Sequence, residues 1–207
     1  MSDVFCIADN LQFARHDFVN RNRIRGALGA EWLSVPVYLK GHSRDPISEM
    51  RIVQDGWSAS HLRSIRLAYE GTSFFERYFD GLQQILLKRH TFLSDLNHEL
   101  LLFLLDALAL KTKIVRATDY ALTGKKNEYI IRMCRRFGAQ TYIFGSLGRN
   151  YADSGLFKEA GIEILFLDYR HPVYRQRRRP FVSNLSVIDL LFNEGPKSLE
   201  ILTSRYP

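Results

Sequence analysis

The chain has 207 residues, of which 46% are hydrophobic and 25% are charged, and these fractions exclude an intrinsically disordered protein. A chain of this length buries roughly 70% of its unfolded surface, so it needs no disulfide bonds to fold. Its 29 Lys and Arg residues outnumber its 22 Asp and Glu residues, and the net charge of +7 allows nucleic acid, anionic lipid or a phosphorylated small molecule as a partner.

Several classes of protein are disfavoured by particular residues. Two cysteines, Cys6 and Cys134, are too few for a disulfide framework or a cysteine-based zinc site. The longest apolar run, at 100–105, is far shorter than the ~20 residues that a bilayer requires, and charged residues interrupt the N-terminal region. The six histidines lack the paired spacing of metal ligands. We therefore expect a soluble, cytoplasmic protein without a membrane span or a bound metal.

The N-terminal part predicts short strands. Val4–Ala8 is apolar and ends in the turn-forming residues at 9–10, so it predicts a strand. Residues 15–31 are polar and contain two glycines, which predicts a loop. Trp32–Leu39 alternates and predicts a strand, with Pro36 marking an edge or a bulge. A further short strand is predicted at 51–54.

Helices are predicted next, as an insertion at about 58–110. Ser58 is a candidate helix cap, and Ser73 and Glu76 have the spacing of a capping box that would open a helix extending to Arg89. Ser94 would open a further helix, whose leucines recur every four residues as one apolar stripe.

The C-terminal half predicts a β-α-β-α-β pattern. The strands are expected at 113–117, 141–144 and 162–167, and the helices at 125–137 and 154–160, ended by Gly138 and Gly161. This alternation is typical of an α/β fold with a mostly parallel sheet flanked by helices, here as one domain over 1–207. Ligands of such folds bind beyond the carboxyl ends of the strands, which singles out the loops at 118–124, 145–153 and 168–179.

The loop Gly145–Tyr151 is the first candidate binding site. Its glycines, Gly145 and Gly148, would let backbone N–H groups approach an anion, and Arg149 would complete a phosphate or carboxylate site, with Asn150 beside it. The alternative is an ordinary turn between a strand and a helix. The loop matches neither the dinucleotide-binding nor the Walker pattern, and we expect no cofactor.

Two histidines are candidate catalytic residues. His171 follows the last predicted strand beside Pro172, where it would take a proton from an attacking amine or hydroxyl while Tyr174 polarised a carbonyl. His61 would lie in the first helical turn after Ser58, where the positive helix end favours its neutral form. The alternatives are a structural loop for His171 and, for His61, an exposed side chain beside a packed Trp57.

Other polar segments have simpler interpretations. Asn20 and Arg21 lie in the predicted polar loop, where they would suit a sugar or phosphate unless the loop is merely solvated. The arginines of the run at 175–179 form a local positive cluster, but the aromatic residues fall at core-like spacings, so nucleic acid is not favoured. Ser186 and Asp189 resemble a capping box, which assigns Ser186 to structure.

Taken together, these motifs resemble the WbqC-like protein family. The resemblance is carried by their order and spacing through nearly the whole chain: Asn20–Ile24, Trp32–Pro36, Trp57 with His61, Gly145–Tyr151, His171–Gln176 and Asn184–Asp189. Members of the family usually begin with a further strand and turn before the strand that is here Val4–Ala8. The resemblance implies that this chain lacks them, so Val4–Ala8 is expected at an exposed sheet edge or paired with another chain.

The resemblance implies a transferase of bacterial surface-polysaccharide (O-antigen) biosynthesis. It would transfer an acyl group, or an aminoacyl group such as glycyl, to the amine of a nucleotide-linked amino sugar. Alternatives are a nucleotidyltransferase-like enzyme and a non-catalytic binding protein of a polysaccharide pathway; a homo-oligomer is compatible with each. His171, Tyr174 and His61 are the expected catalytic residues. Substrate binding is expected of Asn20, Arg21, Trp57, Gly145, Gly148, Arg149, Asn150, Tyr151 and Gln176. We expect these side chains to converge on one cleft.

Overall fold

The computed structural model describes residues 2–42 and 44–204, and the chain forms two compact units. The first unit comprises the chain up to Asn10 and Thr112–Arg170. The second unit comprises Leu11–Lys111 and the chain from His171 onward. Each unit is therefore assembled from two segments that are distant in sequence. The expectation of a single domain over 1–207 stays a prediction.

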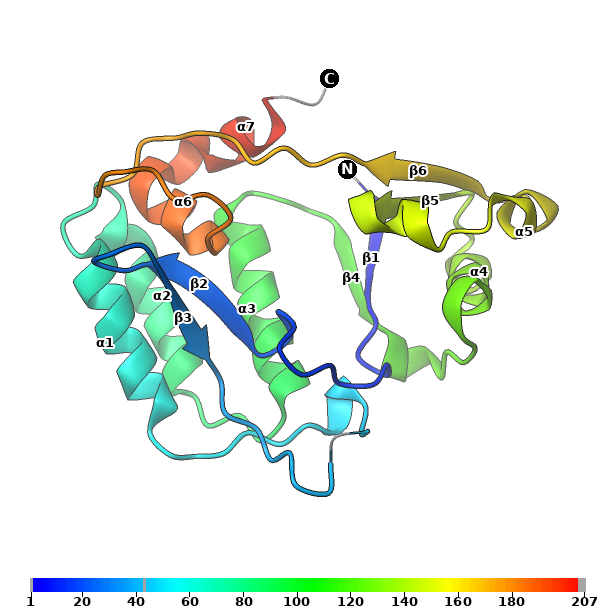
Figure 1. Cartoon of the computed structure of the whole chain (residues 1–207), viewed down its shortest axis with the longest axis horizontal. Coiled ribbons are helices and arrows are strands. Elements are labelled where there is room, and N and C mark those ends of the chain that lie inside the picture. Colours follow the sequence, from blue (N-terminus) through cyan, green and yellow to red (C-terminus); the bar gives the residue numbers. More distant parts are fainter. Residues whose placement is uncertain (1, 43, 205–207) are drawn as a thin grey trace. The chain divides into compact units, whose positions relative to one another are not determined.

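The first unit contains two pairs of parallel strands (Figure 1). β1 (Val4–Ile7) pairs with β4 (Lys113–Arg116), and β5 (Thr141–Gly145) pairs with β6 (Glu163–Leu167). Residues 113–167 thus contribute strands to two ladders, because the partner of β4 is β1 rather than β5. Among the residues that the structure describes, β4 is the only strand paired with β1, which confirms the predicted edge position.

Two helices accompany these strands, α4 (Lys126–Phe137) and α5 (Ser154–Glu159). Gly138 and Gly161 have φ angles of 64° and 70°, so both predicted glycine stops are confirmed in the left-handed conformation that glycine adopts without strain. Short 3₁₀ helices occupy Ala117–Tyr120 and Ser146–Asn150. The mixed arrangement of parallel strands and helices confirms an α/β fold.

The core of the first unit combines aliphatic and aromatic side chains. Phe144 of β5 and Phe157 of α5 are fully buried, with their ring centres 5.5 Å apart, and Cys134 of α4 is buried in the same cluster. Asp9, which follows β1, is also fully buried. Its carboxylate accepts hydrogen bonds from Arg116 Nε at 2.7 Å and from the Thr118 hydroxyl at 3.0 Å, which ties the ends of β1 and β4 together.

The second unit is mainly helical, as the predicted insertion requires. Helix α2 contacts both α1 and α3, and a hairpin of β2 and β3 lies beside α1 (Figure 1). Two further helices follow near the C-terminus, and 3₁₀ helices occupy Ile47–Glu49 and Gly195–Lys197. The bounds are α1 (Trp57–Tyr69), α2 (Phe75–Leu87), α3 (Leu93–Ala107), β2 (Arg21–Arg25), β3 (Ala30–Ser34), α6 (Val187–Glu194) and α7 (Ser198–Thr203).

The predicted loop at 15–31 is the main error in secondary structure. Its residues Arg21–Arg25 form β2, antiparallel to β3, with Arg23 directly opposite Trp32. The strand was missed because only Ile24 is apolar. Two of its three arginines, Arg21 and Arg23, place their guanidinium groups over the Trp32 ring of β3. β3 ends at Ser34, before Pro36, and the predicted strand at 51–54 makes only isolated bridges.

The predicted serine caps were also wrong. The structure shows no side-chain cap for α1, α2 or α3, whose first residues follow Gly56, Phe74 and Phe92. Ser186 does precede α6, but its side chain does not cap the helix either. Packing of large apolar residues sets these helix ends, and a short sequence motif does not detect such packing. Among the described residues, no helix is long and apolar enough to cross a bilayer.

Candidate functional site

The loop after β5 has one glycine required by packing and one that packing does not explain. A Cβ atom on Gly148 would lie 2.5 Å from the Phe144 Cβ atom, so any larger residue would collide with the core. Gly145 has a φ of −68°, and a Cβ atom there would meet open space. Gly145 therefore leaves its backbone uncovered, which is the property that an anion site needs.

Arg149 lies at the end of this loop and contacts the chain beyond β6. Its Nη2 atom donates to Asp168 Oδ2 at 2.9 Å, and its guanidinium group lies 4.6 Å from the centre of the Phe166 ring. Both charged side chains are more than half exposed, so this ion pair contributes little stability and a phosphate group is able to replace the carboxylate. Asn150 and Tyr151 are exposed on the same loop.

Three predicted binding residues and one predicted catalytic residue, His61, do come together in the second unit. Asn20 Nδ2 donates to the Val35 carbonyl at 2.9 Å, and Arg21 lies opposite Ser34 in the hairpin. The His61 Nε2 atom donates to the Ser34 carbonyl at 3.2 Å, while its ring makes an edge contact with the Trp57 ring, centre to centre 5.1 Å. Trp57 itself is buried in the core, so it supports His61 rather than facing a ligand.

The position of His61 differs from the prediction. It is the fifth residue of α1 and so lies beyond the first helical turn, where the effect of the helix dipole has faded. Its pKa is nevertheless lowered from 6.5, chiefly by burial, while the Ser34 carbonyl and the Asp55 charge oppose the shift. Because Nε2 carries the donated proton, the lone pair of the neutral ring is on Nδ1.

This pKa shift predicts a pH effect on stability. Because the folded state holds the His61 proton less tightly than the unfolded state, its contribution is complete above pH 6.5 and is lost as pH falls through the folded pKa. Relative to His61→Gln, the wild-type free energy of unfolding should therefore decrease as the pH falls from neutral to below 6.5. NMR titration of the ring and denaturant unfolding at several pH values measure this. A midpoint above 6.5 would contradict it.

The segment after β6 places His171 beside two aromatic rings. The ring centre of His171 lies 5.9 Å from that of Tyr174 and 6.0 Å from that of Phe181. The His171 Nδ1 atom is 2.8 Å from the Pro172 carbonyl, and a carbonyl oxygen only accepts, so Nδ1 carries the proton. The lone pair of the neutral ring is then on Nε2, the tautomer that a general base needs.

A buried carboxylate that sequence reasoning assigned to a helix cap organises this segment. Asp189 is fully buried, and its Oδ2 atom accepts from the Tyr174 hydroxyl at 2.7 Å and from Gln176 Nε2 at 2.8 Å. Burial raises the pKa of Asp189, although the hydrogen bonds from Tyr174, Gln176 and Tyr69 oppose the shift. The hydroxyl proton of Tyr174 is thus donated to Asp189, which favours a positioning role for Tyr174 over polarising a substrate carbonyl.

Gln176 is occupied in the same way. Its side-chain amide also donates to the Val182 carbonyl and accepts from the Val182 N–H, each at 2.8 Å. These two bonds hold the ends of the loop 176–182 together. Its side chain is buried, with 4% of the residue surface exposed. These contacts favour a structural role for Gln176, although substrate binding was expected of it.

Arg25 is a further organising residue that the sequence did not single out. It is buried at the end of β2, and its guanidinium group donates to the carbonyls of Arg179 and Pro180 at 3.2 Å and of Gly26 at 2.6 Å. The backbone N–H of Arg25 donates to the Tyr69 hydroxyl at 2.9 Å. Arg25 therefore fastens the 171–186 segment to the hairpin.

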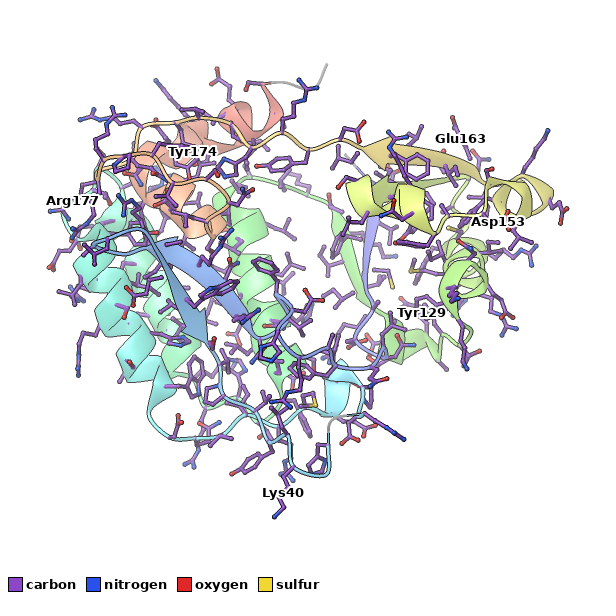
Figure 2. All side chains as sticks on the ribbon, in the orientation of Figure 1. Lys40, Tyr129, Asp153, Glu163, Tyr174 and Arg177 are labelled. Carbon is purple, nitrogen blue, oxygen red and sulfur yellow. The ribbon has the colours of Figure 1, made fainter. Side chains whose placement is uncertain are left out.

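The basic run has a structural use as well. Arg177 and Arg178 donate to the carbonyls of Glu70 and Leu67, at the C-terminal end of α1, where positive charge is favourable. Figure 2 shows Arg177 at this edge of the second unit and Tyr174 closer to α6. The local positive cluster of the sequence is thus explained in part by capping of α1.

The predicted site residues fall into three groups. Asn20, Arg21, Trp57 and His61 lie near the start of β2, while Arg179 and Pro180 are fastened near its end, about 13 Å away if each strand residue advances about 3.3 Å. His171, Tyr174 and Gln176 belong to the segment that leads to Arg179. Gly145–Tyr151 belongs to the first unit. The convergence of Arg149 with His171 on one cleft therefore stays a prediction.

Two signals in the sequence could have revealed the missed residues. Arg25 is the one arginine of β2 that follows the apolar Ile24, next to Gly26, where a turn brings carbonyl groups close. Asp189 stands between Ile188 and Leu190 in an apolar run, so helical periodicity alone places it on a buried face, where a carboxylate needs partners.

Comparisons with known proteins give a consistent result. The family model described as "WbqC-like protein family" matches residues 1–201. The chain is also similar to the uncharacterized protein Rv1507c of Mycobacterium tuberculosis (strain ATCC 25618 / H37Rv), with 34% identity over 202 residues, which cover 97% of this chain and 87% of that protein. No significant match to a solved structure was found.

Proposed function

Because the chain belongs to the WbqC-like protein family, we propose that it transfers an acyl or aminoacyl group to the amine of a nucleotide-linked amino sugar. Membership of this family supports a role related to polysaccharide biosynthesis. The transfer reaction is our interpretation of how the candidate residues would serve such a role.

The position of His171 carries the proposal. Its Nδ1 proton is held by the Pro172 carbonyl, so Nε2 has the lone pair that accepts a proton. The segment that follows it is held at three points: Tyr174 donates to Asp189, Gln176 donates to Val182, and Arg25 donates to the Arg179 carbonyl. Such fixation keeps a general base in one orientation, which proton transfer requires.

The reaction itself needs one base and one polarised carbonyl. The nitrogen lone pair of the sugar amine attacks the acyl carbonyl and forms the C–N bond, while His171 Nε2 takes a proton from that nitrogen. Collapse of the tetrahedral intermediate breaks the bond to the donor's leaving group, which recovers the proton from His171. An amide and a free carrier result. His61, neutral because burial lowers its pKa, is the second candidate base in the same unit.

The phosphates of the nucleotide sugar are assigned to the loop in the first unit. Gly145 offers an uncovered backbone, and the exposed Arg149 is paired only weakly with Asp168. Exchange of that carboxylate for a phosphate would leave Arg149 in an equally favourable contact.

The experiment combines binding with product analysis. The purified chain is titrated with UDP-linked amino sugars, the matching non-amino sugars and ATP, and thermal stabilisation is recorded; acylated sugar is sought by mass spectrometry with thioester donors. Stabilisation by the amino sugars together with an amide product supports the proposal. Stabilisation by ATP alone favours nucleotidyl transfer, and no response to any of these compounds contradicts the proposal.

Arg149→Ala gives a sharper prediction for the same titration. Loss of one charged contact should weaken nucleotide-sugar binding on the order of tenfold at low salt, and by less at high salt, where charge interactions are screened. Arg135→Ala removes an exposed arginine of α4 in the same unit and should leave binding unchanged. Equal losses in both variants would contradict the assignment.

A further inference from the structure

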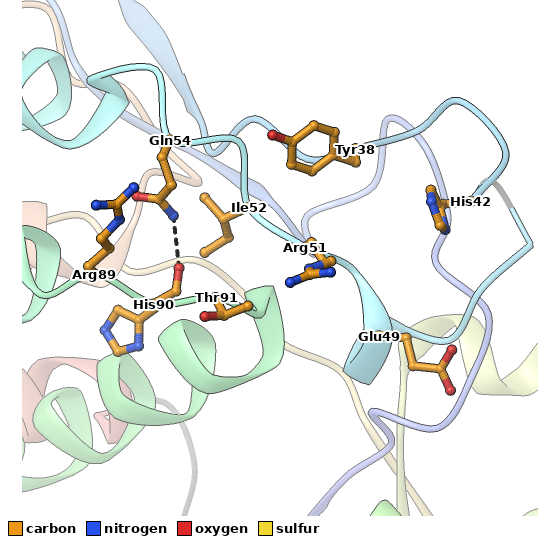
Figure 3. Close-up of a pocket in the computed structure, with 9 residues that line it drawn as sticks. All are labelled: Tyr38, His42, Glu49, Arg51, Ile52, Gln54, Arg89, His90 and Thr91. Atoms are coloured by element: carbon orange, nitrogen blue, oxygen red, sulfur yellow. Dashed lines mark hydrogen bonds between the residues drawn. The ribbon is translucent and has the colours of Figure 1, made fainter.

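A cavity of about 530 Å³ lies in the second unit, and its walls contain none of the residues discussed above as candidates (Figure 3). Its volume is in the range of about 300–1,000 Å³ that is usual for small-molecule sites. Six residues that the argument uses line it: Tyr38, Glu49, Arg51, Gln54, Arg89 and Thr91.

Three extended segments line the cavity, and backbone hydrogen bonds join them to one another. The Tyr38 N–H donates to the Arg51 carbonyl at 3.0 Å, and the Ile52 N–H donates to the Thr91 carbonyl at 2.9 Å. Gln54 Nε2 donates to the His90 carbonyl at 2.9 Å, the contact drawn in Figure 3. The backbone thus holds the three segments that carry the lining side chains in register.

Two guanidinium groups face this cavity without a compensating acid. Within residues 2–42 and 44–204, neither Arg51 nor Arg89 has a hydrogen bond or ion pair to a carboxylate; the Arg51 guanidinium lies 5.9 Å from the centre of the Phe92 ring. Both histidines of the wall do have acidic neighbours, since His42 contacts Asp45 at 2.6 Å and His90 contacts Glu99 at 3.3 Å. In the view of Figure 3, Glu49 lies beyond Arg51, on the side away from Arg89.

The number of donors indicates the ligand. One guanidinium fork satisfies both oxygens of a carboxylate, so two forks in one cavity suit a group with more acceptor oxygens. A diphosphate has such oxygens, and the Tyr38 side chain, 54% exposed, offers a ring face to the organic part of the ligand. We propose that this cavity binds a small ligand through a diphosphate group held by Arg51 and Arg89.

The natural ligand follows from the proposed function, and the inference rests on that function in this respect only. A transfer reaction needs a donor as well as the nucleotide sugar, so the cavity would hold an acyl donor whose carrier contains a diphosphate. The cavity is close in sequence to His61 and its contacts. Tyr38 of the wall is four residues after Ser34, which His61 contacts, and Gln54 of the wall is three residues before Trp57.

Calorimetric titration of the full chain with inorganic pyrophosphate tests the site. Arg51→Ala and Arg89→Ala should each weaken binding on the order of tenfold, because each removes a charge-assisted contact. Arg51→Lys should have an intermediate effect, since it keeps the charge without the fork. Arg135→Ala, an equal loss of charge in the first unit, should bind like the wild type. Glu49→Gln should bind slightly more tightly.

Several results would overturn the inference. These are absence of pyrophosphate binding, equal affinity in the Arg51→Ala and Arg135→Ala variants, or malonate binding as tightly as pyrophosphate. If the Arg51→Ala variant fails to fold, as judged by circular dichroism, the affinity of Arg51→Lys for pyrophosphate decides whether Arg51 binds it. Pyrophosphate binding that depends on Arg51, in a protein that acylates no sugar, would refute the proposed function and retain this site.

Discussion

Replacing His171 with alanine is expected to lower the rate of acyl transfer by on the order of a hundredfold or more, the usual effect of losing a general base. The ring is only partly buried and its Nδ1 atom donates to the carbonyl of the adjacent Pro172, so the fold should persist. The rate is measured in the mass-spectrometric assay with an amino-sugar acceptor, alongside the melting temperature. Val173→Ala, at a position 71% exposed in the same loop, is the matched control.

A second variant separates catalysis from positioning. His171→Asn keeps an amide N–H that is able to donate to the Pro172 carbonyl, but it has no group that accepts a proton at neutral pH. It should therefore be as slow as the alanine variant. Full activity in either variant would refute the assignment of His171 as base, and recovery with asparagine alone would show that its role is structural.

Replacing Asp189 with alanine is expected to reduce the free energy of unfolding by about 3 kcal/mol, because it leaves buried donors without their acceptor. The Tyr174 hydroxyl and the Gln176 amide both donate to Asp189 Oδ2, and the charge of Arg25 is nearby. Asp189→Asn offers one oxygen for both bonds and should cost only about 1 kcal/mol. Denaturant titration measures both values.

The pH dependence of these variants has a definite sign. Burial raises the pKa of Asp189, so the folded state holds its proton more tightly than the unfolded state, for which the ordinary value is 3.8. The resulting stabilisation is complete below pH 3.8 and is lost as pH rises through the raised pKa. Relative to Asp189→Asn, the free energy of unfolding of the wild type should therefore fall as the pH rises from 3.8 through the raised pKa of Asp189. A difference that is independent of pH would contradict the shift.

The elements that the sequence predicted well depend on local signals. Gly138 and Gly161 allow left-handed turns at the ends of α4 and α5, and the short apolar runs between them form β5 and β6. These features involve residues within a few positions of one another, so periodicity and turn chemistry detect them. Family membership likewise follows from motifs read along the chain.

The prediction failed where contacts between distant segments outweigh local preference. β2 has a charged sequence, yet its pairing with β3 and the stacking of Arg21 and Arg23 on Trp32 stabilise it as a strand. The stability of such a strand depends on the residues of its partner strand, and the propensities of its own residues carry no information about that partner. The serine caps failed for a similar reason, since packing determined where the helices begin.

The sequence by itself determined the family, the α/β class and the candidate residues His171, His61 and Arg149. Only the tertiary structure decided which polar side chains are free to act, because hydrogen bonds across long sequence separations occupy some of them. Asp189 accepts hydrogen bonds from the Tyr174 hydroxyl and the Gln176 amide, and Arg25 donates to carbonyls more than 150 positions away. A buried polar group must find such partners, and their identity depends on which segments the fold brings together.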